Sequence, residues 1–340
     1  MTTRVGLMGF GRIGRNILRQ AAHRDDIDIV AISDLASPNA LAYLMEYDTV
    51  YGRFDGGIGL EGQVLSAGRQ RCRLLRGVTP LDLPWDAFGV DVVVEATHQY
   101  RTRELLEGHL VSGAKRVILT TPALDSIDRT IIHGVNHDNL KPTDHIVSCS
   151  STTTHALALT LKVLDEAIGV QRAFMTNVHA YTSDQKLADM ATDDLRRSRS
   201  AAENLIPNET WAPEVVGQMM PHLAGCLQGV AVNVPVANGS NIDLVSQLAR
   251  KTTVEEVNAI FDEAASGPLA PYLQVAREPI VSSDVIGNTR SAIFDQLATL
   301  LMAGDLLKTV TWYDNGWGYA SRILETIETM ATFIAKETAQ

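Results

Sequence analysis

Three glycines near the start of the chain have the spacing of a loop that binds a dinucleotide. Gly9, Gly11 and Gly14 follow a short apolar run and open a helical pattern. Glycines in such a loop allow a tight turn, a close approach of the backbone to pyrophosphate, and close packing of helix on strand. The helix N-terminus also offers free N–H groups to the negative charge. The alternative is a strand–helix turn with no ligand.

Asp34 strengthens the dinucleotide interpretation. It stands twenty positions beyond Gly14, at the end of the next predicted strand. A carboxylate there can accept hydrogen bonds from both ribose hydroxyls of the adenosine, and it repels a 2′-phosphate. The loop and Asp34 together predict NAD as the cofactor in preference to NADP.

Three later segments carry polar side chains where an active site could form. They are residues 148–155, 178–185 and 312–319. The first segment runs from a strand end into a helix start and is rich in hydroxyls, which can cap the helix or help to bind an anion on its free N–H groups. The second segment directly follows a predicted strand.

Alternating apolar runs and helical patterns position these segments. In the first 150 residues, strands are predicted at 5–8, 27–32, 90–95, 116–120 and 145–148, and helices at 14–23 and 103–112. This rhythm is typical of a parallel sheet with crossover helices. After a helix at 153–168, β-like runs at 172–179, 227–236 and 241–247 lie too close together for a helix between each pair, which favours an α+β arrangement.

The chain is long enough for two domains, because 340 residues exceed the usual size of a single domain. The predicted fold class is α/β, with a Rossmann-type parallel sheet domain followed by an α+β catalytic domain with a mixed, largely antiparallel sheet. We place the first domain at residues 1–151 and the second at 152–316. A helical pattern at 321–339 closes the chain.

Composition narrows the class of protein. The formal net charge of −11 offers no basic surface for nucleic acid, so we expect none as a partner. Three widely spaced cysteines provide neither a disulfide framework nor a CxxC metal site, and we expect no metal. No apolar run approaches a bilayer span, and no signal peptide is evident. We therefore expect a cytoplasmic protein with no membrane contact.

A charged run at residues 193–199 lies in a segment of some forty residues with little periodicity. Such a run is most often a solvated face. A segment of this length is also often functional or interfacial, so a contact between subunits is the alternative.

Taken together, these segments resemble the phosphorylating glyceraldehyde-3-phosphate dehydrogenase family from end to end. The stretches that carry the resemblance are GFGRIGRN, YDTVYGRFDG, DVVVEAT, GAKRVILTTPA, GVNHD, HAYTSDQ, DLRRSR, NLIP and WYDNGWGY. The resemblance implies a small-molecule substrate, a homotetramer, and a C-terminal helix, residues 317–340, that returns to the first domain. It also implies contacts of Arg12, Ile13 and Asp34 with NAD, Thr120 near the nicotinamide, and Asn315 on its carboxamide. The cofactor-binding residues expected from the loop and the resemblance are Gly9, Phe10, Gly11, Arg12, Ile13, Gly14, Asp34, Thr120 and Asn315.

The chain departs from this family at the reactive position. An ungapped alignment over residues 146–158 places Thr152 on the catalytic cysteine of the family and His155 on an asparagine. The family reaction attacks an aldehyde with a thiolate, passes hydride to NAD and releases a thioester to phosphate. An alcohol keeps its proton where a thiol can be ionised, so the thioester route should be closed at Thr152.

Cys149 is the alternative nucleophile. It stands three residues before Thr152, so in an extended segment the two Cα atoms would be roughly 10 Å apart. Strand alternation would point the two side chains in opposite directions. A local shift of the chain could rescue Cys149, but a packed structural cysteine is the commoner outcome.

His179 matches the general base of the family without any shift. The alternative is a histidine satisfied by a hydrogen bond at a strand end. If Thr152 and His179 face each other, the pair could donate or relay a proton while hydride passes between a carbonyl and the nicotinamide.

The predicted substrate site is altered as well. By the resemblance, the hydroxyls that hold phosphate are those of Ser151, Thr153, Thr182 and Thr210. Asn233 stands where the family has a phosphate-binding arginine, and Trp211 replaces a glycine. Loss of a bidentate cation and gain of an indole should weaken phosphate binding.

Two function classes lead at this point, and a non-redox enzyme that uses bound NAD stays open as a third. The first is an NAD-dependent oxidoreductase that acts on an aldehyde or a related small, sugar-derived substrate, phosphorylated or not, without normal thioester chemistry. The second is a catalytically silent NAD-binding paralogue that serves as a sensor or partner subunit.

Overall fold

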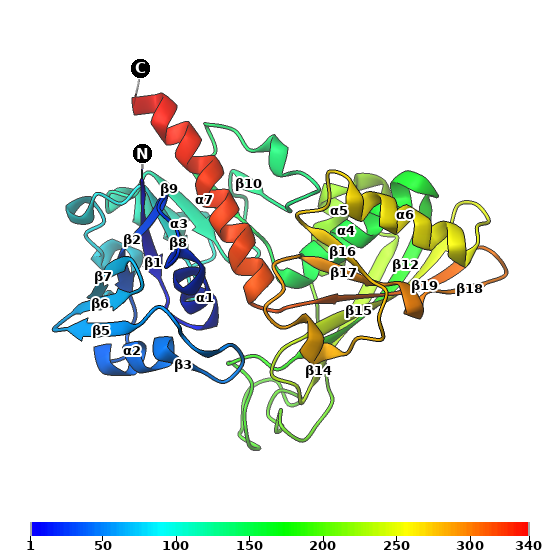
Figure 1. Cartoon of the computed structure of the whole chain (residues 1–340), viewed down its shortest axis with the longest axis horizontal. Helices are drawn as coiled ribbons and strands as arrows, with labels where there is room; N and C mark the ends of the chain where they lie inside the picture. Colours follow the sequence, from blue (N-terminus) through cyan, green and yellow to red (C-terminus); the bar gives the residue numbers. More distant parts are fainter. Residues whose placement is uncertain (1, 339–340) are drawn as a thin grey trace. The chain divides into compact units, whose positions relative to one another are not determined.

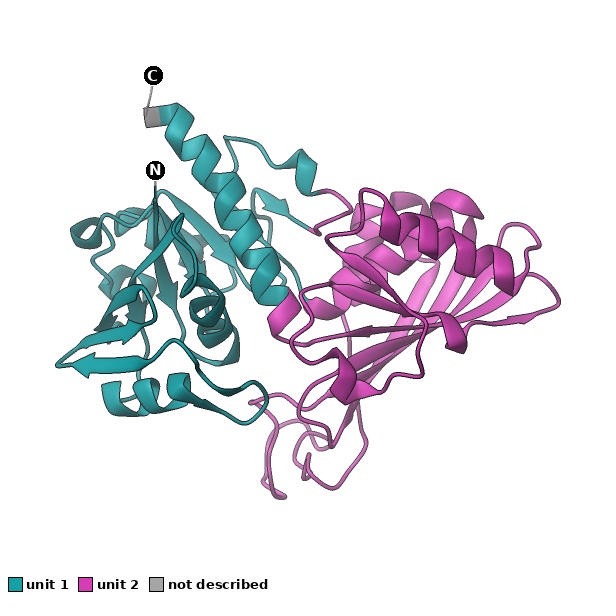
Figure 2. Cartoon of the chain, in the orientation of Figure 1, with its two compact units in different colours: residues 1–131, 137–151, 319–340 teal, residues 132–136, 152–318 magenta. Residues whose placement is uncertain are grey.

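The structure is a computed structural model that describes residues 2–338. The chain forms two compact units, which Figure 2 shows in different colours. Unit 1 comprises residues 1–131, 137–151 and 319–340, and unit 2 comprises residues 132–136 and 152–318. Each unit is built around a hydrophobic core of its own.

A nine-stranded sheet forms the centre of unit 1 (Figure 1). Its strands are β1 (Thr3–Met8), β2 (Ile27–Ser33), β5 (Ile58–Glu61), β6 (Val64–Ala67), β7 (Gln70–Leu75), β8 (Val92–Glu95), β9 (Arg116–Leu119), β10 (Arg129–Thr130) and β11 (Ile146–Ser148). They lie in the order β10-β11-β9-β8-β1-β2-β7-β6-β5. The pairs from β10 to β7 are parallel, and the edge strands β6 and β5 are antiparallel.

Both faces of this parallel sheet are covered, which explains why β8 and β9 are buried at every position. The helices of unit 1 are α1 (Arg12–Ala21), α2 (Pro38–Glu46), α3 (Arg103–Val111) and all but the first two residues of α7 (Trp317–Thr338), with short 3₁₀ turns η1 (Pro80–Asp82), η2 (Asp86–Phe88) and η3 (His137–Asn139). Val92 and Val94 pack on the side of α1 and α7, whereas Val93 packs with Trp85 on the other side. A small hairpin, β3 (Tyr47–Asp48) and β4 (Gly52–Arg53), follows α2.

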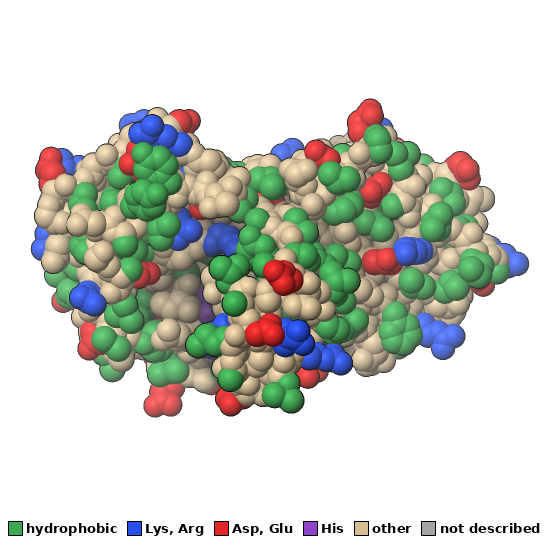
Figure 3. All heavy atoms as spheres, turned by 90° about the horizontal axis from the view of Figure 1, so that it is seen from below, with side chains coloured by type: hydrophobic (Ala, Val, Ile, Leu, Met, Phe, Trp, Pro, Cys, Tyr) green, Lys and Arg blue, Asp and Glu red, His purple; other side chains and the backbone are tan. Residues whose placement is uncertain are grey.

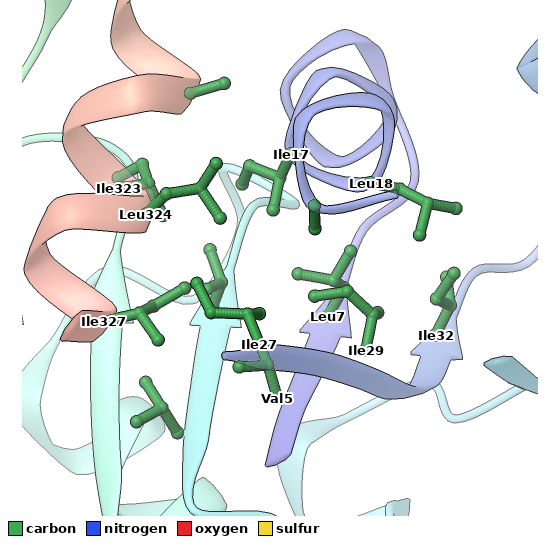
Figure 4. Packing of buried hydrophobic residues seen from close by; sticks show 14 of the residues in the cluster. Val5, Leu7, Ile17, Leu18, Ile27, Ile29, Ile32, Ile323, Leu324 and Ile327 are labelled. Carbon is green, nitrogen blue, oxygen red and sulfur yellow. The ribbon is translucent and has the colours of Figure 1, made fainter. Parts of the chain in front are cut away.

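Helix α7 completes the core of unit 1. Ile323, Leu324 and Ile327 lie beside Ile17 of α1 and above the strands that carry Val5 and Ile27 (Figure 4). Ile327 follows Leu324 by three residues and Ile323 by four, which places the three side chains on one helix face. The C-terminal helix is therefore an integral part of the same core as the glycine loop.

Unit 2 contains a mixed eight-stranded sheet with helices on one face. Its strands are β12 (Val170–Ala180), β13 (Ile206–Asn208), β14 (Leu227–Val234), β15 (Ser240–Leu248), β16 (Leu273–Ala276), β17 (Ala292–Asp295), β18 (Leu300–Met302) and β19 (Leu306–Tyr313). Its helices are α4 (Thr152–Ala167), α5 (Ala212–Met219) and α6 (Val254–Ser266), with 3₁₀ turns η4 (Pro221–Leu223), η5 (Ser282–Val285) and η6 (Gln296–Ala298). The main path is β13-β14-β12-β15-β19-β17-β16, with β18 paired to β19.

Strand direction in this second sheet agrees with the predicted fold class. β12 pairs in parallel with β14 and antiparallel with β15, and β15 pairs antiparallel with β19. One face packs on α4, whereas the other leaves Phe174 68% exposed. The prediction of a Rossmann-type domain and a mixed second sheet is confirmed.

Three parts of the chain differ from the expected element pattern. Helix α6 and strands β16 to β19 lie between residues 248 and 314, where no helix or strand was predicted. Helix α2 and strands β3 to β7 lie between residues 34 and 90, where no element was predicted. The segment of some forty residues before β14 contains β13 and α5, so its irregular part is shorter than expected. In that irregular part the charged run is largely exposed, with Asp193, Asp194 and Arg196 at the surface.

Three further observations concern surface charge, membrane-spanning helices and metal-binding clusters. On the face in Figure 3, Lys and Arg side chains are scattered among Asp and Glu. Within residues 2–338, no helix has the length and apolar character needed to span a bilayer. The same residues contain no cluster of three or more His, Cys, Asp or Glu side chains suited to a metal ion.

Candidate active site

The glycine loop joins the end of β1 to the start of α1 in unit 1. Gly9 has a φ of +96°, a conformation that side chains other than glycine rarely adopt. A Cβ on Gly14 would lie 2.4 Å from the carbonyl oxygen of Gly9, so the third glycine lets the helix pack against the turn. A Cβ on Gly11 would meet no protein atom within 4 Å. The space above the turn is therefore open to a ligand.

Helix α1 presents its N-terminus at this open space. Its N-cap is Gly11, which has no side chain to accept a hydrogen bond from the first turn. The first turn contains no acidic residue, so nothing there opposes an anion. Arg12 and Ile13 are half-buried next to the turn. These features fit the pyrophosphate of NAD, whose charge would be held by the backbone N–H groups.

Asp34 follows β2 and is hydrogen-bonded to the glycine loop. Its Oδ2 accepts from the backbone N–H of Phe10 at 2.9 Å, and its Oδ1 accepts from the N–H of Ala36 at 2.9 Å. Each carboxylate oxygen can accept a second hydrogen bond. The half-buried carboxylate thus has a fixed orientation and spare acceptor capacity, as binding to ribose hydroxyls requires.

Thr120 lies directly after β9 and is 4% exposed. Its Oγ1 donates to the carbonyl oxygen of Glu95 at 3.0 Å, and its backbone N–H donates to the same oxygen at 3.0 Å. The hydroxyl thus ties the ends of two neighbouring parallel strands together, at the edge of the sheet where ligands of such folds bind.

Cys149 is packed in the core of unit 1. Its side chain is fully buried and belongs to the cluster that includes Val5 and Ile323. The Sγ atom lies 3.3 Å from Oγ1 of Thr326 on α7. Burial raises the pKa of the Cys149 thiol to about 12, so it is protonated at neutral pH. This environment suits a structural cysteine and gives no access to a substrate.

The three cysteines should differ in their reactivity towards an alkylating reagent. In the native protein at pH 8, we expect iodoacetamide to modify the half-buried Cys226 first and to leave Cys149 and Cys72 unmodified, because the last two are buried and their thiol pKa values are raised. Peptide mass spectrometry provides the measurement. The same reaction in urea, where all three should react, is the control, and native labelling of Cys149 at the rate of Cys226 would contradict its placement.

The start of α4 is tied to two strands of unit 2. Thr153, in the first turn, is 6% exposed, and its Oγ1 lies 2.8 Å from the hydroxyl of Tyr313 on β19. Asn177 of β12 donates to the same Oγ1 at 3.1 Å and accepts from Tyr313 at 2.9 Å. Burial raises the pKa of Tyr313 to about 12, so its hydroxyl remains a donor. The Thr153 hydroxyl is thus committed to the interior, whereas Thr152 and Ser151 are only half-buried.

His179 lies near the end of β12 and has a defined orientation. Its Nδ1 lies 2.6 Å from the carbonyl oxygen of Ala180, which can only accept, so Nδ1 carries a proton. Its Nε2 lies 3.1 Å from Nδ2 of Asn315, which can only donate. The hydrogen-bond network therefore assigns a neutral imidazole with Nε2 as the acceptor.

Asn315 is itself held on both sides. Its Oδ1 accepts from the hydroxyl of Ser240 at 2.8 Å, and its backbone N–H donates to Asn238 at 2.9 Å. The residue is 8% exposed, so these partners fix the amide that faces His179. Asn315, just after β19, thus links His179 of β12 to Ser240 at the start of β15.

Uncharged amides adjoin His179 on the neighbouring strand. Asn233 of β14 is in register with His179, and its Oδ1 accepts from Nδ2 of Asn208 at 3.4 Å. Asn233 is only 6% exposed. A neutral polar side chain, that of Asn233, therefore occupies the position where the resemblance implies an arginine.

The other predicted substrate residues lie on the loops around this strand end. The hydroxyl of Thr182 donates to Asp184, which is paired with Arg197. Thr210 accepts from the N–H of Ala212, in a long contact of 3.4 Å. Trp211 is the N-cap of α5 and is 45% exposed. A hydroxyl already bound to a carboxylate is a weaker candidate for a phosphate.

Two residues of the His179 environment were not identified from the sequence, namely Asn177 and Tyr313. Strand alternation was the signal available for both. Asn177 precedes His179 by two positions within β12, so the two side chains share one face of that strand, and Tyr313 is the last residue of β19, two positions before Asn315. The rings of His179 and Tyr313 are 6.4 Å apart in an edge arrangement.

A glycine loop of this geometry on a parallel sheet, with a carboxylate after the second strand, defines the class of dinucleotide-binding proteins. Comparison with known proteins agrees. The family model described as glyceraldehyde 3-phosphate dehydrogenase, NAD binding domain, matches residues 3–103, and the model of the C-terminal domain matches residues 148–315. NAD is therefore the cofactor.

Curated relatives match almost the whole chain. A plasmid-encoded glyceraldehyde-3-phosphate dehydrogenase of Cupriavidus necator is 45% identical over 97% of this chain and 99% of its own length. Enzymes of the same name from Geobacillus stearothermophilus and Bacillus subtilis are 43% and 41% identical, each over 99% of both chains. The chain belongs to the glyceraldehyde-3-phosphate dehydrogenase family, a family of NAD-dependent oxidoreductases.

Proposed function

We propose that this protein transfers hydride between NAD and a small, sugar-derived carbonyl or hydroxy substrate without forming a thioester. The observation that carries the proposal is the environment of His179. A neutral imidazole is fixed with Nε2 as acceptor beside the amide of Asn315. The half-buried Thr152, at the position that the resemblance assigns to the reactive cysteine, supplies an alcohol in place of a thiol.

His179 is the proposed proton acceptor. In the oxidising direction its Nε2 takes the proton of a substrate hydroxyl, and the Asn315 amide that now donates to Nε2 gives way to that hydroxyl. Bound NAD supplies the acceptor for the hydride that leaves the same carbon. The alcohol thereby loses one proton and one hydride and becomes a carbonyl compound. The Thr152 hydroxyl donates a hydrogen bond to the substrate oxygen.

The resemblance implies a site that binds a phosphate group tightly. We propose that the part of the substrate at this site is uncharged or weakly anionic. Asn233 is neutral, and the Thr182 hydroxyl already donates to Asp184. The relatives named above are glyceraldehyde-3-phosphate dehydrogenases, so an aldehyde of this type is the first compound to test. We propose in addition a cytoplasmic homotetramer, on the strength of the resemblance.

Replacement of His179 by Gln tests the proposal. We expect kcat to fall by about 10²- to 10⁴-fold, because a positioned general base is lost, while the dissociation constant of NAD changes less than about twofold. The assay follows NADH at 340 nm in both directions over a panel of small aldehydes, ketones and polyols. His222→Gln is the matched control, because His222 is an exposed histidine paired with Asp165. An unchanged kcat in His179→Gln would contradict the assignment.

A catalytically silent NAD-binding protein is the second candidate. Thr152 favours it, because the loss of the nucleophile removes the step by which the family captures its aldehyde. Under this alternative the wild-type protein binds NAD and turns over none of the panel, and His179→Gln changes nothing. Measurable wild-type turnover that His179→Gln abolishes would exclude it.

A further inference from the structure

We propose that Glu95 and His109 are positioning residues for NAD, which act with Trp85 as a buried hydrogen-bonded chain that holds the Ala96–Thr97 turn against the glycine loop. The inference rests on the proposed placement of NAD at that loop. The three residues come from separate parts of unit 1. Glu95 ends β8, His109 lies on α3, and Trp85 precedes η2.

All three side chains are removed from solvent. Trp85, Glu95 and His109 are each 0% exposed. The indole Nε1 of Trp85 donates to Nδ1 of His109 at 3.0 Å, and Nε2 of His109 lies 3.2 Å from Oε2 of Glu95. A carboxylate without solvent must have its oxygens hydrogen-bonded, and these contacts begin to meet that need.

The chemistry of the indole fixes the direction of the chain. An indole N–H can only donate, so Nδ1 of His109 must accept and carries no proton. The imidazole is therefore neutral, its proton is on Nε2, and it donates to Glu95. Oε2 of Glu95 is the acceptor of this bond.

The other oxygen of Glu95 holds the turn that follows β8. Its Oε1 accepts from the backbone N–H of Thr97 at 2.7 Å and also from the hydroxyl of Thr97. The N–H of Ala96 donates to the carbonyl oxygen of Met8, at the end of β1, at 2.7 Å. The carboxylate thus clamps a turn that is hydrogen-bonded to the strand leading into the glycine loop.

The glycines of β1 and its loop lie directly against both ends of this chain. A Cβ on Gly9 would lie 2.7 Å from the carbonyl carbon of Ala96 and 2.8 Å from the nitrogen of Thr97. A Cβ on Gly6 would lie 2.7 Å from the ring of Trp85. Because there is no spare space at either contact, a displacement of Trp85 or of the turn displaces the backbone that faces the pyrophosphate.

Three variants of His109 and Glu95 test the proposal by the dissociation constant of NAD, measured calorimetrically on the full chain. His109→Leu removes both the acceptor and the donor, and we expect NAD binding to weaken by roughly 10-fold, the equivalent of one or two lost hydrogen bonds. His109→Gln retains an acceptor and a donor, and we expect binding within about threefold of the wild type. The amide of Glu95→Gln must turn its NH2 group towards either the Nε2–H of His109 or the N–H of Thr97, which are both donors, so we expect a loss like that of His109→Leu.

A second measurement does not depend on NAD binding. Long-range ¹H–¹⁵N correlation spectra of the wild-type protein should show His109 as the neutral form protonated at Nε2, and Trp85→Phe should lose this fixed state. A His109 protonated at Nδ1, or on both nitrogens, would overturn the proposal.

The binding data distinguish failure of this proposal from failure of the NAD site. If Asp34→Ala weakens NAD binding and His109→Leu does not, the buried chain serves stability alone and the proposal is overturned. If neither variant weakens binding, the placement of NAD at the glycine loop is wrong. Weaker NAD binding in His109→Leu, together with near-normal binding in His109→Gln, supports the positioning role. If the loss came only from disturbed packing, a side chain that restores the hydrogen bonds would not restore the affinity.

Discussion

Replacement of Thr152 by Cys is expected to raise phosphate-dependent oxidation of glyceraldehyde 3-phosphate by roughly 10³-fold or more, because loss of a nucleophile in covalent catalysis costs factors of this order. Position 152 begins α4, where the helix N-terminus lowers the pKa of a thiol, and an alcohol there keeps its proton. The first turn of α4 is tied to β12 two residues before His179, through Asn177. The measurement is NADH formation in the presence and absence of phosphate.

A neighbouring cysteine provides the matched control. Ser151→Cys introduces the same thiol one position earlier, at a residue of similar burial, and should gain no such activity. A combined Thr152→Cys and Asn233→Arg variant should lower KM for the phosphorylated aldehyde further, since a bidentate cation returns beside His179. Thr152→Cys could instead leave the rate unchanged while NAD still binds. The residues around position 152 would then be adapted to another reaction, and the alignment of Thr152 with the catalytic cysteine of the family would not explain the activity of this protein.

Replacement of Asp34 by Ala is expected to weaken NAD binding by about 10²-fold or more, in line with the loss of two hydrogen bonds to a charged acceptor. The same variant should improve NADP relative to NAD, because the charge that repels a 2′-phosphate is removed. Titration of NADH and NADPH by fluorescence measures both affinities. Asp34 also accepts from Phe10, so some loss will come from the loop itself.

The control for Asp34 is an exposed acid of the same unit. Asp55, whose side chain is 85% exposed, can be replaced by Ala with no expected change in either affinity. Equal affinity of the wild-type protein for NADPH and NADH, unaltered in Asp34→Ala, would contradict the assignment of Asp34 to the ribose.

The glycine loop and the fold class could be predicted because their signals are local. A glycine with positive φ, a helix start and a carboxylate after the next strand leave a pattern within about thirty residues, and alternating apolar runs indicate a parallel sheet. The hairpin β5–β6 escaped prediction because each of its strands has only four residues, too few for the alternation in burial to stand out in the sequence. Its place at the sheet edge depends on β7, which only the folded structure reveals.

The candidate site was harder to predict from the sequence, because its contacts join residues that are far apart in the chain. Asn177, Tyr313 and Thr153 are separated by 24 to 160 positions, yet they share one hydrogen-bond network. The buried chain through Glu95 and His109 likewise gives no pattern that periodicity could detect. Cys149 was weighed between a reactive and a packed residue, and only its contact with Thr326 on α7 shows how it is enclosed.

Intact-protein mass spectrometry of the wild-type chain tests the central claim most directly. The protein is mixed with NAD and glyceraldehyde 3-phosphate in the absence of phosphate, so that any acyl-enzyme would accumulate. The mass is predicted to remain that of the unmodified chain, since residue 152 holds a protonated alcohol and Cys149 is enclosed in the core. An added phosphoglyceryl group on any residue, discharged when phosphate is supplied, would contradict the account.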